Sequence, residues 1–288
     1  MAQAGDMPEI IPSGAALGAD VHGVDLGNLG EAAFETIRKA ALDHLVLRFR
    51  DQSLDDAALI GFGRRFGDLL GQGASIVGKH YIEEYPEILC VSNIKDDDGK
   101  PLGNLGSGEA IWHSDQSYWD EPPSYSILNA VELPPEGGDS HFCNQYLAYE
   151  TLPDDLKSAL EGKRLVHDES TNSAGQMRAG FDEINDPRKA PGARHPGVRT
   201  HPETGQKALY LGRRRNSAVL DMDLAAGEAL LDQVWRHATL EKFTWIQVWR
   251  PGDVVMWDNR CTLHRRDGFD NSQRRMMHRI QVAGSVPA

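Results

Sequence analysis

Apolar side chains recur every three or four residues in two long stretches of the chain, and this spacing predicts amphipathic helices. The first stretch covers residues 31–45, where Phe34 and Ile37 share one face. The second covers residues 224–239, and Asp223 in front of it is the expected N-cap. Each helix therefore has an apolar face that must pack against another part of the fold.

Two shorter helical patterns lie beside residues that start or interrupt helices. Ser53 is placed to begin a helix, and Asp56, three residues later, takes the reciprocal position of a capping box. Residues 146–161 also have helical spacing, but Pro153 interrupts them because proline cannot continue the backbone hydrogen bonding of a helix.

Most other apolar residues alternate with polar ones or form short apolar runs, which are the patterns of β-strands. The predicted strands cover residues 46–49, 87–94, 124–133, 140–144, 207–212, 243–250, 253–259 and 274–284. Because regular helices do not separate these strands, a doubly wound parallel sheet is excluded. The pattern predicts an α+β domain built on a β-sandwich or jelly roll, with helices outside it.

Two segments show neither pattern. Residues 95–109 are polar and rich in glycine, which is typical of a mobile loop. The GNLGSG sequence at 103–108 lacks the strand–turn–helix setting of a dinucleotide-binding loop. Residues 170–198 contain few large apolar side chains, and we expect a long loop that acts as a lid. With no internal repeat or low-complexity tract, residues 1–288 are expected to form one domain.

Charge and composition restrict the partners and the compartment. The 288 residues carry a formal net charge of −13 at pH 7, so the surface repels nucleic acids and anionic membranes, although a local basic pocket could still bind an anionic small molecule. No apolar run approaches the roughly 18 residues of a membrane span, and the N-terminal sequence lacks the pattern of a signal peptide. The three cysteines form no CxxC pair, which favours a reducing, cytoplasmic location.

The segment IWHSDQSYW, residues 111–119, contains the first candidates for chemistry. On a strand, His113 and Asp115 would point to one face while Ser114 pointed away. His264, just after an apolar strand and a tight turn, is the best candidate for a third metal ligand. Two imidazoles and one carboxylate leave positions open on a metal, as in non-heme Fe(II) oxygenases. The alternative is that all three are ordinary hydrogen-bonded side chains.

The C-terminal strand carries two candidate anion-binding residues. In the alternating sequence RRMMHRIQ, Arg275 and Arg279 share one face with Met277 and Gln281. Arginines that point inward from a central strand need anions. An Fe(II) enzyme that uses a 2-oxo acid must hold its distal carboxylate, and a guanidinium can do so through two hydrogen bonds. The alternative is that both arginines pair with the acidic exterior.

These segments resemble the TauD/TfdA family of Fe(II)- and 2-oxoglutarate-dependent dioxygenases. The similarity runs from residue 17 to the end of the chain and is densest in WHSDQSY, ELPPEGGDSHF, VRTHPETGQKALYLG, VMWDNRCTLHR and RRMMHR. The aryloxyalkanoate branch is closer than the taurine branch, through YSILNAVELPPEGGDSHFC and THPETGQKALYLG. The resemblance implies a double-stranded β-helix, or jelly roll, flanked by helices. It also implies a homo-oligomer, either a dimer or a tetramer.

The resemblance implies a role for each polar residue of the site. The three ligand candidates would bind Fe(II). Ser140 would help Arg275 to hold the C5 carboxylate of 2-oxoglutarate, and Arg279 would reach the acidic group of the substrate or the inner end of the co-substrate. The reaction with O₂ would hydroxylate a small organic acid, such as an aryloxyalkanoate or sulfonate, and release succinate and CO₂. A product hydroxylated beside an ether oxygen, sulfonate or amine would collapse to an aldehyde or keto acid.

The candidate substrate residues are less well defined. Lys79 and His80 lie where relatives place a cationic or hydrogen-bonding group against the substrate anion. Tyr118 and Trp119 follow the metal-ligand segment and could form a wall of the pocket. Arg213, the first of three consecutive arginines, could bind an anion. Each of these residues also has an ordinary explanation. Lys79 and His80 could belong to a solvated loop, Tyr118 and Trp119 could simply pack in the core, and Arg213 could lie in a solvated basic turn.

Two other functions are compatible with the same residues. A metal-binding jelly roll could act as a hydrolase or isomerase with Zn²⁺ as Lewis acid. The combination of Arg275 with Ser140 argues against this, because such chemistry needs no site for a dicarboxylate. A binding protein with a vestigial site is the third reading, and the presence of all five expected polar residues argues against it.

Overall fold

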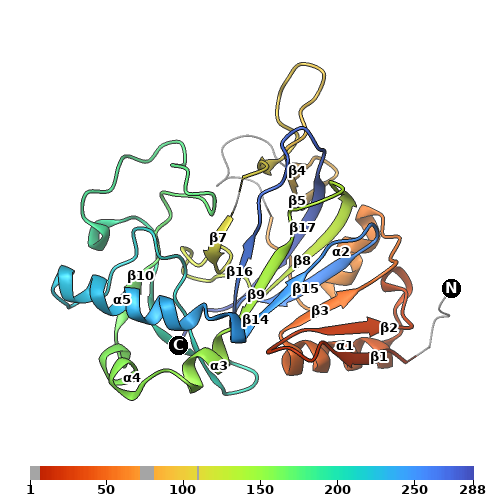
Figure 1. Ribbon diagram of the computed structural model, residues 1–288. Helices are drawn as coiled ribbons and strands as arrows, with labels where there is room; N and C mark the ends of the chain where they lie inside the picture. The colour runs from red at the N-terminus through yellow and green to blue at the C-terminus, as the bar shows by residue number, and fades with distance from the viewer. Residues whose placement is uncertain (1–6, 72–80, 109) are drawn as a thin grey trace.

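The computed structural model describes residues 7–71, 81–108 and 110–288. Two β-sheets that face each other lie at its centre (Figure 1). The larger sheet has the spatial order β1 (Glu9–Pro12), β2 (Ala19–His22), β3 (Val46–Phe49), β15 (Val254–Asp258), β8 (Tyr125–Glu132), β17 (Met276–Val282), β5 (Tyr85–Ser92) and β4 (Tyr81–Ile82), with β6 (Asn104–Leu105) beside β5. The smaller sheet has the order β14 (Thr244–Gln247), β9 (Ser140–Asn144), β16 (Thr262–Arg266) and β7 (Ala110–His113).

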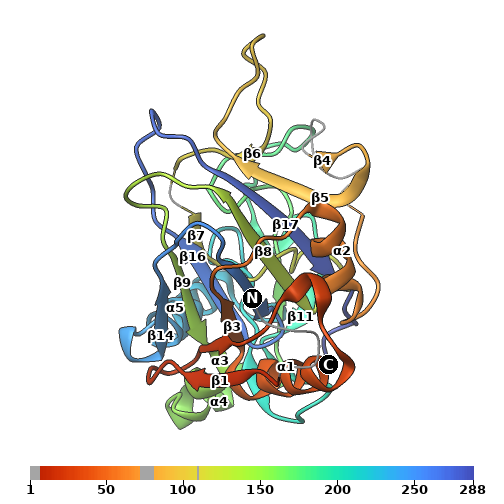
Figure 2. The ribbon, with the colours of Figure 1, turned by 90° about the vertical axis from the view of Figure 1, so that its right-hand side faces the viewer.

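Helices cover the outer faces of both sheets. The larger sheet packs against α1 (Glu31–His44) and α2 (Asp56–Arg64), which lie on the side that faces the viewer in Figure 2. The smaller sheet packs against α3 (Gln145–Glu150), α4 (Asp154–Leu160) and α5 (Leu224–Ala238). The short 3₁₀ helices are η1 (Leu26–Asn28), η2 (Pro187–Lys189) and η3 (Glu241–Phe243). No helix within the described ranges is long and apolar enough to cross a membrane.

The cores explain why the central strands are apolar on both faces. On β8, Ile127 points to the core shared with α1 and α2, while Leu128 points to the core between the sheets. On β9, Phe142 lies between the sheets, while Cys143 packs with the helices behind the smaller sheet. Because neighbouring residues of a strand point to opposite faces, the inner face of the smaller sheet is available for a site.

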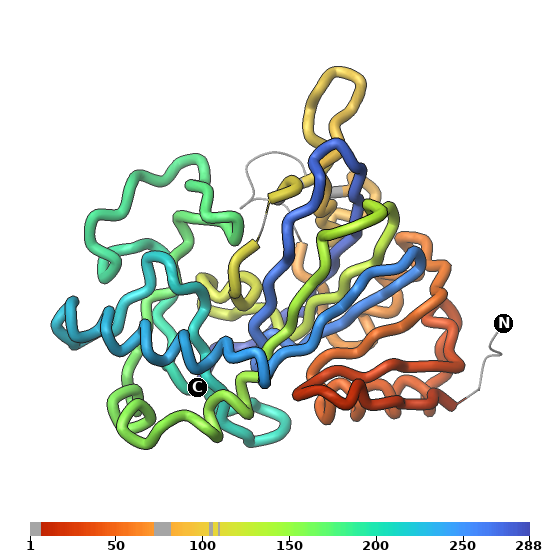
Figure 3. Tube along the Cα trace, viewed as in Figure 1, coloured from red at the N-terminus to blue at the C-terminus, as the bar shows by residue number. Residues whose placement is uncertain are grey.

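Two strand pairs and the C-terminus complete the side of the smaller sheet. β10 (Arg164–Val166) pairs with β11 (Arg194–Pro196), and β12 (Val198–Thr200) pairs with β13 (Lys207–Leu209). After β17 the chain runs back to this side, where the backbone N–H of Thr200 donates to the carbonyl of Ala288 (Figure 3).

Most of the predicted elements are present, with one correction at the start of a helix. Pro153 separates α3 from α4, and Asp223 caps α5, as the sequence indicates. The prediction that Ser53 begins a helix is wrong, because α2 begins at Asp56. Its N-cap is Asp55, whose side chain accepts a hydrogen bond from a backbone N–H of the first turn.

The segment 170–198 is more ordered than a continuous loop. It contains η2 and β11 and reaches the first residue of β12. One end is tied to the smaller sheet by a hydrogen bond from the N–H of Ile111 to the carbonyl of Ser173. The other end is tied to the turn after β7, where the N–H of Ala193 donates to the carbonyl of Tyr118. Its middle part is largely exposed and projects from the body of the protein in Figure 1. A lid role stays a prediction.

Candidate active site

Two histidines and one aspartate meet on the inner face of the smaller sheet. His113 ends β7 and lies directly opposite His264 on β16. The Nε2 atoms of the two imidazoles lie 3.7 and 3.8 Å from Oδ1 of Asp115. One ligand atom from each residue falls within 4.8 Å of the others, close enough to share a metal ion. The three predicted ligands are thus brought together from segments that are distant in sequence.

The local route to this geometry differs from the sequence prediction. His113 and Asp115 do not share one strand, because β7 ends at His113. The chain then turns, and Gln116 adopts a left-handed φ of 44°. Ser114 points away, as expected, and its hydroxyl donates to the carbonyl of Asn259. A turn, rather than strand alternation, therefore directs the carboxylate towards the imidazoles.

The ionisation states suit metal binding. Burial is the main cause that lowers the pKa of His113 well below its ordinary value and that of His264 to about 4. Burial raises the pKa of Asp115, but the Arg279 guanidinium and the two imidazoles outweigh it and lower that pKa overall. At neutral pH the site therefore offers two neutral imidazoles and one carboxylate. This all-nitrogen and oxygen set fits Fe(II) and leaves positions for other ligands.

Hydrogen bonds orient the ligands. Nδ1 of His113 lies 2.7 Å from the carbonyl of Ile111, an arrangement that leaves the lone pair of Nε2 free to bind a metal. The hydroxyl of Ser126 on β8 donates to Oδ2 of Asp115 at 2.7 Å and itself accepts from Nδ2 of Asn259 at 2.8 Å. The sequence analysis missed Ser126, because a serine in an alternating strand carries no signal of its partner in space.

We expect Ser126→Ala to weaken metal affinity about tenfold, because the Asp115 carboxylate loses the donor that orients it. Turnover at saturating metal should change little. Anaerobic titration with Fe(II) would measure the effect. Ser124→Ala is the matched control, since this hydroxyl donates to the carbonyl of Ala283 and is not bonded to Asp115. Equal weakening in both variants would contradict the proposed role of Ser126.

A cavity of about 50 Å³ adjoins the three ligand candidates. His113 and His264 line it together with Ser140, Arg275 and Arg279. Apolar side chains form much of the remaining lining, notably Val91, Leu128, Phe142 and Trp257. The cavity therefore combines a possible metal site with cationic side chains in a largely apolar wall.

Arg275 is a buried cation in the wall of the cavity. Its side chain belongs to a residue only 1% exposed, and none of its three guanidinium nitrogens has a hydrogen-bond partner in the described part of the chain. Burial and the neighbouring Arg266 lower the pKa of Arg275 to about 9, so it stays protonated at neutral pH. A buried charge of this kind requires an anionic partner, and the cavity thus fits a carboxylate at this end.

The backbone is shaped to bring Arg275 and Ser140 together. Gly138, just before β9, has a φ of +72°, and a Cβ at this position would lie 3.2 Å from Nε of Arg275. Ser140 begins β9 and accepts a hydrogen bond from Nε1 of Trp249 at 3.2 Å. Its own hydroxyl proton is thus directed elsewhere and can be donated to a ligand.

Arg279, unlike Arg275, is paired with a carboxylate. Its Nη1 donates to Oδ1 of Asp115 at 2.9 Å, the same oxygen that lies beside both imidazoles. Its Nε is buried and finds no partner within the described residues. Arg279 therefore keeps the Asp115 carboxylate ionised. Its Nε–H remains available to a ligand, because no described residue accepts a hydrogen bond from it.

The candidate substrate residues that the structure describes lie outside the lining of the cavity. Tyr118 is buried and accepts a hydrogen bond from Arg178 at 2.8 Å, while Trp119 is half-buried and its carbonyl contacts His195. The Arg213 guanidinium donates to two backbone carbonyls of the 170–198 segment and lies 5.9 Å from the Tyr118 ring. None of the three lines the cavity. Lys79 and His80 lie outside the described residues.

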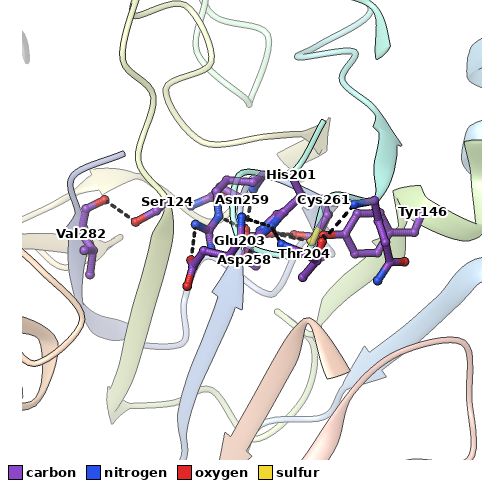
Figure 4. A network of polar contacts seen from close by, with 12 residues as sticks. Ser124, Tyr146, His201, Glu203, Thr204, Asp258, Asn259, Cys261 and Val282 are labelled. Atoms are coloured by element: carbon purple, nitrogen blue, oxygen red, sulfur yellow. Dashed lines mark hydrogen bonds and ion pairs between the residues drawn. The ribbon is translucent and has the colours of Figure 1, made fainter. Parts of the chain in front are cut away.

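A second group of potential ligands has a structural explanation. His201, Asp258 and Cys261 also lie within 4.8 Å of one another (Figure 4). Nδ1 of His201 accepts from backbone N–H groups, so its Nε2 donates to Asp258 at 3.1 Å. Arg260 donates to both oxygens of Asp258 and to Glu203. Burial raises the pKa of the Cys261 thiol. This network holds the turn between β15 and β16, and with it the strand that carries His264.

We expect Asp258→Asn to lower the free energy of unfolding by about 2 kcal/mol, because the new amide nitrogen would face either Arg260 or His201, both of which are donors. Urea denaturation would measure the loss. Asp43→Ala is a control that breaks the exposed pair with Lys39 and should cost about 0.5 kcal/mol or less. Similar losses in the two variants would contradict the structural role of the network.

Comparisons with known proteins agree with this geometry. The sequence profile described as "Taurine catabolism dioxygenase TauD, TfdA family" matches residues 9–281. The α-ketoglutarate-dependent 2,4-dichlorophenoxyacetate dioxygenase of Cupriavidus pinatubonensis is 36% identical over 91% of this chain and 92% of its own. Pentalenolactone F synthase of Streptomyces avermitilis is 32% identical over 100% of this chain and 97% of its own.

Among solved structures, AAD-2 in complex with Mn(II) and N-oxalylglycine matches with a TM-score of 0.79 and 30% identity. The match covers 98% of this chain and 99% of AAD-2. The profile matches nearly the whole chain, and relatives above 30% identity cover it almost completely. The buried His–Asp–His cluster therefore lies in a chain whose relatives are dioxygenases. The chain belongs to the TauD/TfdA family of dioxygenases.

Proposed function

We propose that this dioxygenase oxidises a small organic anion of the aryloxyalkanoate or sulfonate type beside the cavity between its two sheets. The enzyme uses Fe(II), 2-oxoglutarate and O₂. The observation that carries the proposal is one cavity with a cluster of two histidines and one aspartate beside it and the Arg275 guanidinium, which has no hydrogen-bond partner among the described residues, in its lining. An acidic co-substrate satisfies both features at once.

The metal would be held by His113, Asp115 and His264. When bound, iron and 2-oxoglutarate together supply O₂ activation, with release of succinate and CO₂ and hydroxylation of the substrate. The protein contributes neutral imidazoles, a carboxylate kept ionised by Arg279, and a largely apolar cavity wall. Ser126 keeps the carboxylate in position.

The co-substrate would be held at its far end by Arg275 with Ser140. A protonated guanidinium and a hydroxyl can satisfy both oxygens of a carboxylate, and burial strengthens the interaction because water does not compete. Arg279, beside Asp115, would meet the inner end of the co-substrate or the acidic group of the substrate through its remaining donor.

The substrate would approach from the side of the 170–198 segment, which we propose as a lid. Tyr118 and Arg213 are held against this segment, and Trp119 lies beside them. We assign these residues, with Lys79 and His80, as candidates for contacts with the substrate. Hydroxylation next to an ether oxygen or sulfonate would give a product that collapses to an aldehyde or keto acid.

The finer features of the fold belong to the same proposal. We propose that the two facing sheets form a double-stranded β-helix, supported by the antiparallel pairing of β14, β9, β16 and β7 opposite the larger sheet. We also propose a single domain that assembles as a dimer or tetramer in the cytoplasm, with no nucleic-acid or membrane partner. Light scattering with size-exclusion chromatography would measure the assembly.

A substrate screen tests the function directly. Aryloxyalkanoates, other ethers and sulfonates would be offered with Fe(II) and 2-oxoglutarate, and O₂ uptake and succinate would be measured for each. The expected result is stimulation by a subset of these anions, with one succinate formed per oxidised substrate. A hydrolase or isomerase using the same metal site would convert a substrate without O₂ and form no succinate. Stimulation only by neutral compounds would contradict the anionic substrate class.

A further inference from the structure

Two arginines lie close to the ring of Tyr118, a short distance along the chain from the proposed metal ligand Asp115. The guanidinium carbon of Arg178 lies 4.4 Å from the ring centre, and that of Arg213 lies 5.9 Å from it. Nη1 of Arg178 donates to the Tyr118 hydroxyl at 2.8 Å, so the hydroxyl proton can itself be donated to a ligand. We refer to these three side chains as the Tyr118 cluster.

The backbone joins the Tyr118 cluster to the turn that carries the metal ligands. Gly212 directly precedes Arg213, and its carbonyl accepts a hydrogen bond from the N–H of Ser114. Ser114 lies between His113 and Asp115 in the chain. Arg178 comes from the 170–198 segment, so the cluster forms where this segment meets the metal-ligand turn.

The two guanidinium groups of the cluster have no carboxylate partner within the described residues. The side chain of Arg178 donates only to Tyr118, and that of Arg213 donates only to two backbone carbonyls. One of these carbonyls belongs to Asp168, but both oxygens of the Asp168 carboxylate already accept hydrogen bonds, from Ser170, Thr171 and Asn216. The positive charge of the cluster is therefore not neutralised by an ion pair among these residues.

Burial places Arg213 in an environment that favours an anion. The residue is only 7% exposed. Burial, followed by the charge of Arg178, lowers the pKa of Arg213 to about 10, although the acidic groups around it, Asp115 included, act to raise it. Arg213 stays protonated at neutral pH, and a bound anion would relieve both the cost of burial and the repulsion between the two guanidinium groups.

We propose that Arg178 and Arg213, with the Tyr118 hydroxyl, bind the oxyanion of the primary substrate. This inference rests on the proposed function. It leaves Arg279, which pairs with Asp115, to the inner end of the co-substrate. A guanidinium is a planar fork of N–H donors that can hold two oxygens of a carboxylate or a sulfonate. The acidic group would then bind where the 170–198 segment meets the metal-ligand turn.

The test measures binding rather than turnover. Protein loaded with Mn(II) and 2-oxoglutarate, without O₂, would be titrated in a calorimeter with phenoxyacetate as the carboxylate probe and phenylmethanesulfonate as the sulfonate probe. The wild type should bind at least one of them, and the comparison shows which oxyanion the cluster prefers. A separate titration of the Mn(II)-loaded protein would give the Kd of 2-oxoglutarate.

Arg178 is the residue to substitute, because Arg213 also holds the backbone of the segment through its two carbonyl contacts. Arg178→Gln should raise the Kd of the bound probe about tenfold, the loss expected for a hydrogen bond between charged groups. The Kd of 2-oxoglutarate should change less than about twofold, because the cluster does not line the cavity that holds Arg275.

Arg188→Gln is the matched control. Arg188 belongs to the same segment, but it is exposed and pairs with Asp186. Its substitution should change neither Kd. An unchanged Kd of the probe in Arg178→Gln, or an equal rise for the probe and 2-oxoglutarate, would overturn the proposal. Binding of neither probe by the wild type would count against this inference and also against the anionic substrate class of the proposed function.

Tyr118→Phe provides a second arm that keeps the ring and removes only the hydroxyl. We expect the Kd of the same probe to rise about threefold, because Arg178 loses the acceptor that positions it and the anion loses a donor. The Kd of 2-oxoglutarate should again stay within about twofold of the wild-type value. Equal probe Kd values for Tyr118→Phe and the wild type would also count against the proposal.

Discussion

Asp115→Ala should abolish Fe(II) binding and reduce turnover by about a thousandfold or more. Asp115 is the single anionic member of the cluster, and without it two neutral imidazoles remain beside the Arg279 guanidinium. That cation, no longer neutralised, would repel a divalent metal. We therefore expect metal affinity to fall further than it would if one ligand were removed from a site without a nearby cation.

Metal content after anaerobic reconstitution and succinate formation from 2-oxoglutarate would measure this effect. Asp115→Asn is the companion variant, because the amide keeps the shape of the side chain and its contact with Ser126 while removing the charge. Both variants should keep the far-ultraviolet circular dichroism spectrum of the wild type. Turnover within tenfold of the wild type in Asp115→Ala would reject the ligand assignment.

Arg275→Gln should raise the KM for 2-oxoglutarate at least about a hundredfold and should change the KM for the primary substrate little. Arg275 is only 1% exposed, and its guanidinium has no hydrogen-bond partner among the described residues. Salt and water would therefore screen its attraction to a bound carboxylate very little. Glutamine can offer one neutral hydrogen bond where arginine offers a charged pair.

Steady-state kinetics would measure both KM values, with one substrate varied while the other is kept saturating. The two KM values would then be compared between the variant and the wild type. Arg274→Gln is a close control, because the preceding arginine is exposed and pairs with Glu132 on the outside of the protein. It should leave both KM values unchanged. A rise confined to the primary substrate would mean that the roles assigned to Arg275 and Arg279 are exchanged.

Short-range patterns predicted much of the fold. The helices at 31–45 and 224–239 and the central strands were readable because an amphipathic segment shows its buried face in its own periodicity. The edge strands β1 and β2 were not predicted. The start of α2 was misread because both Ser53 and Asp55 are good N-caps, and the backbone path decides which one can reach the free N–H groups. Capping preferences alone do not resolve such a choice.

The candidate site was only partly readable. Residue types and spacing singled out the two histidines, the aspartate, and the arginines Arg275 and Arg279, of which only Arg279 lies in β17. Strand alternation was the wrong reason for His113 and Asp115, since a turn after β7 brings the carboxylate round. Ser126 was missed, because no local pattern shows that its hydroxyl faces the Asp115 carboxylate.

By itself, the sequence determined which residue types are available to bind a metal and a dicarboxylate, and which faces of the strands and helices are buried. These properties depend on neighbours along the chain. Only the tertiary structure decided that Arg279 faces Asp115, that Arg266 and Arg275 share one cavity, and that Ser126 supports the carboxylate. Such contacts join strands far apart in the sequence, and their partners are set by sheet order and register, which no local pattern encodes.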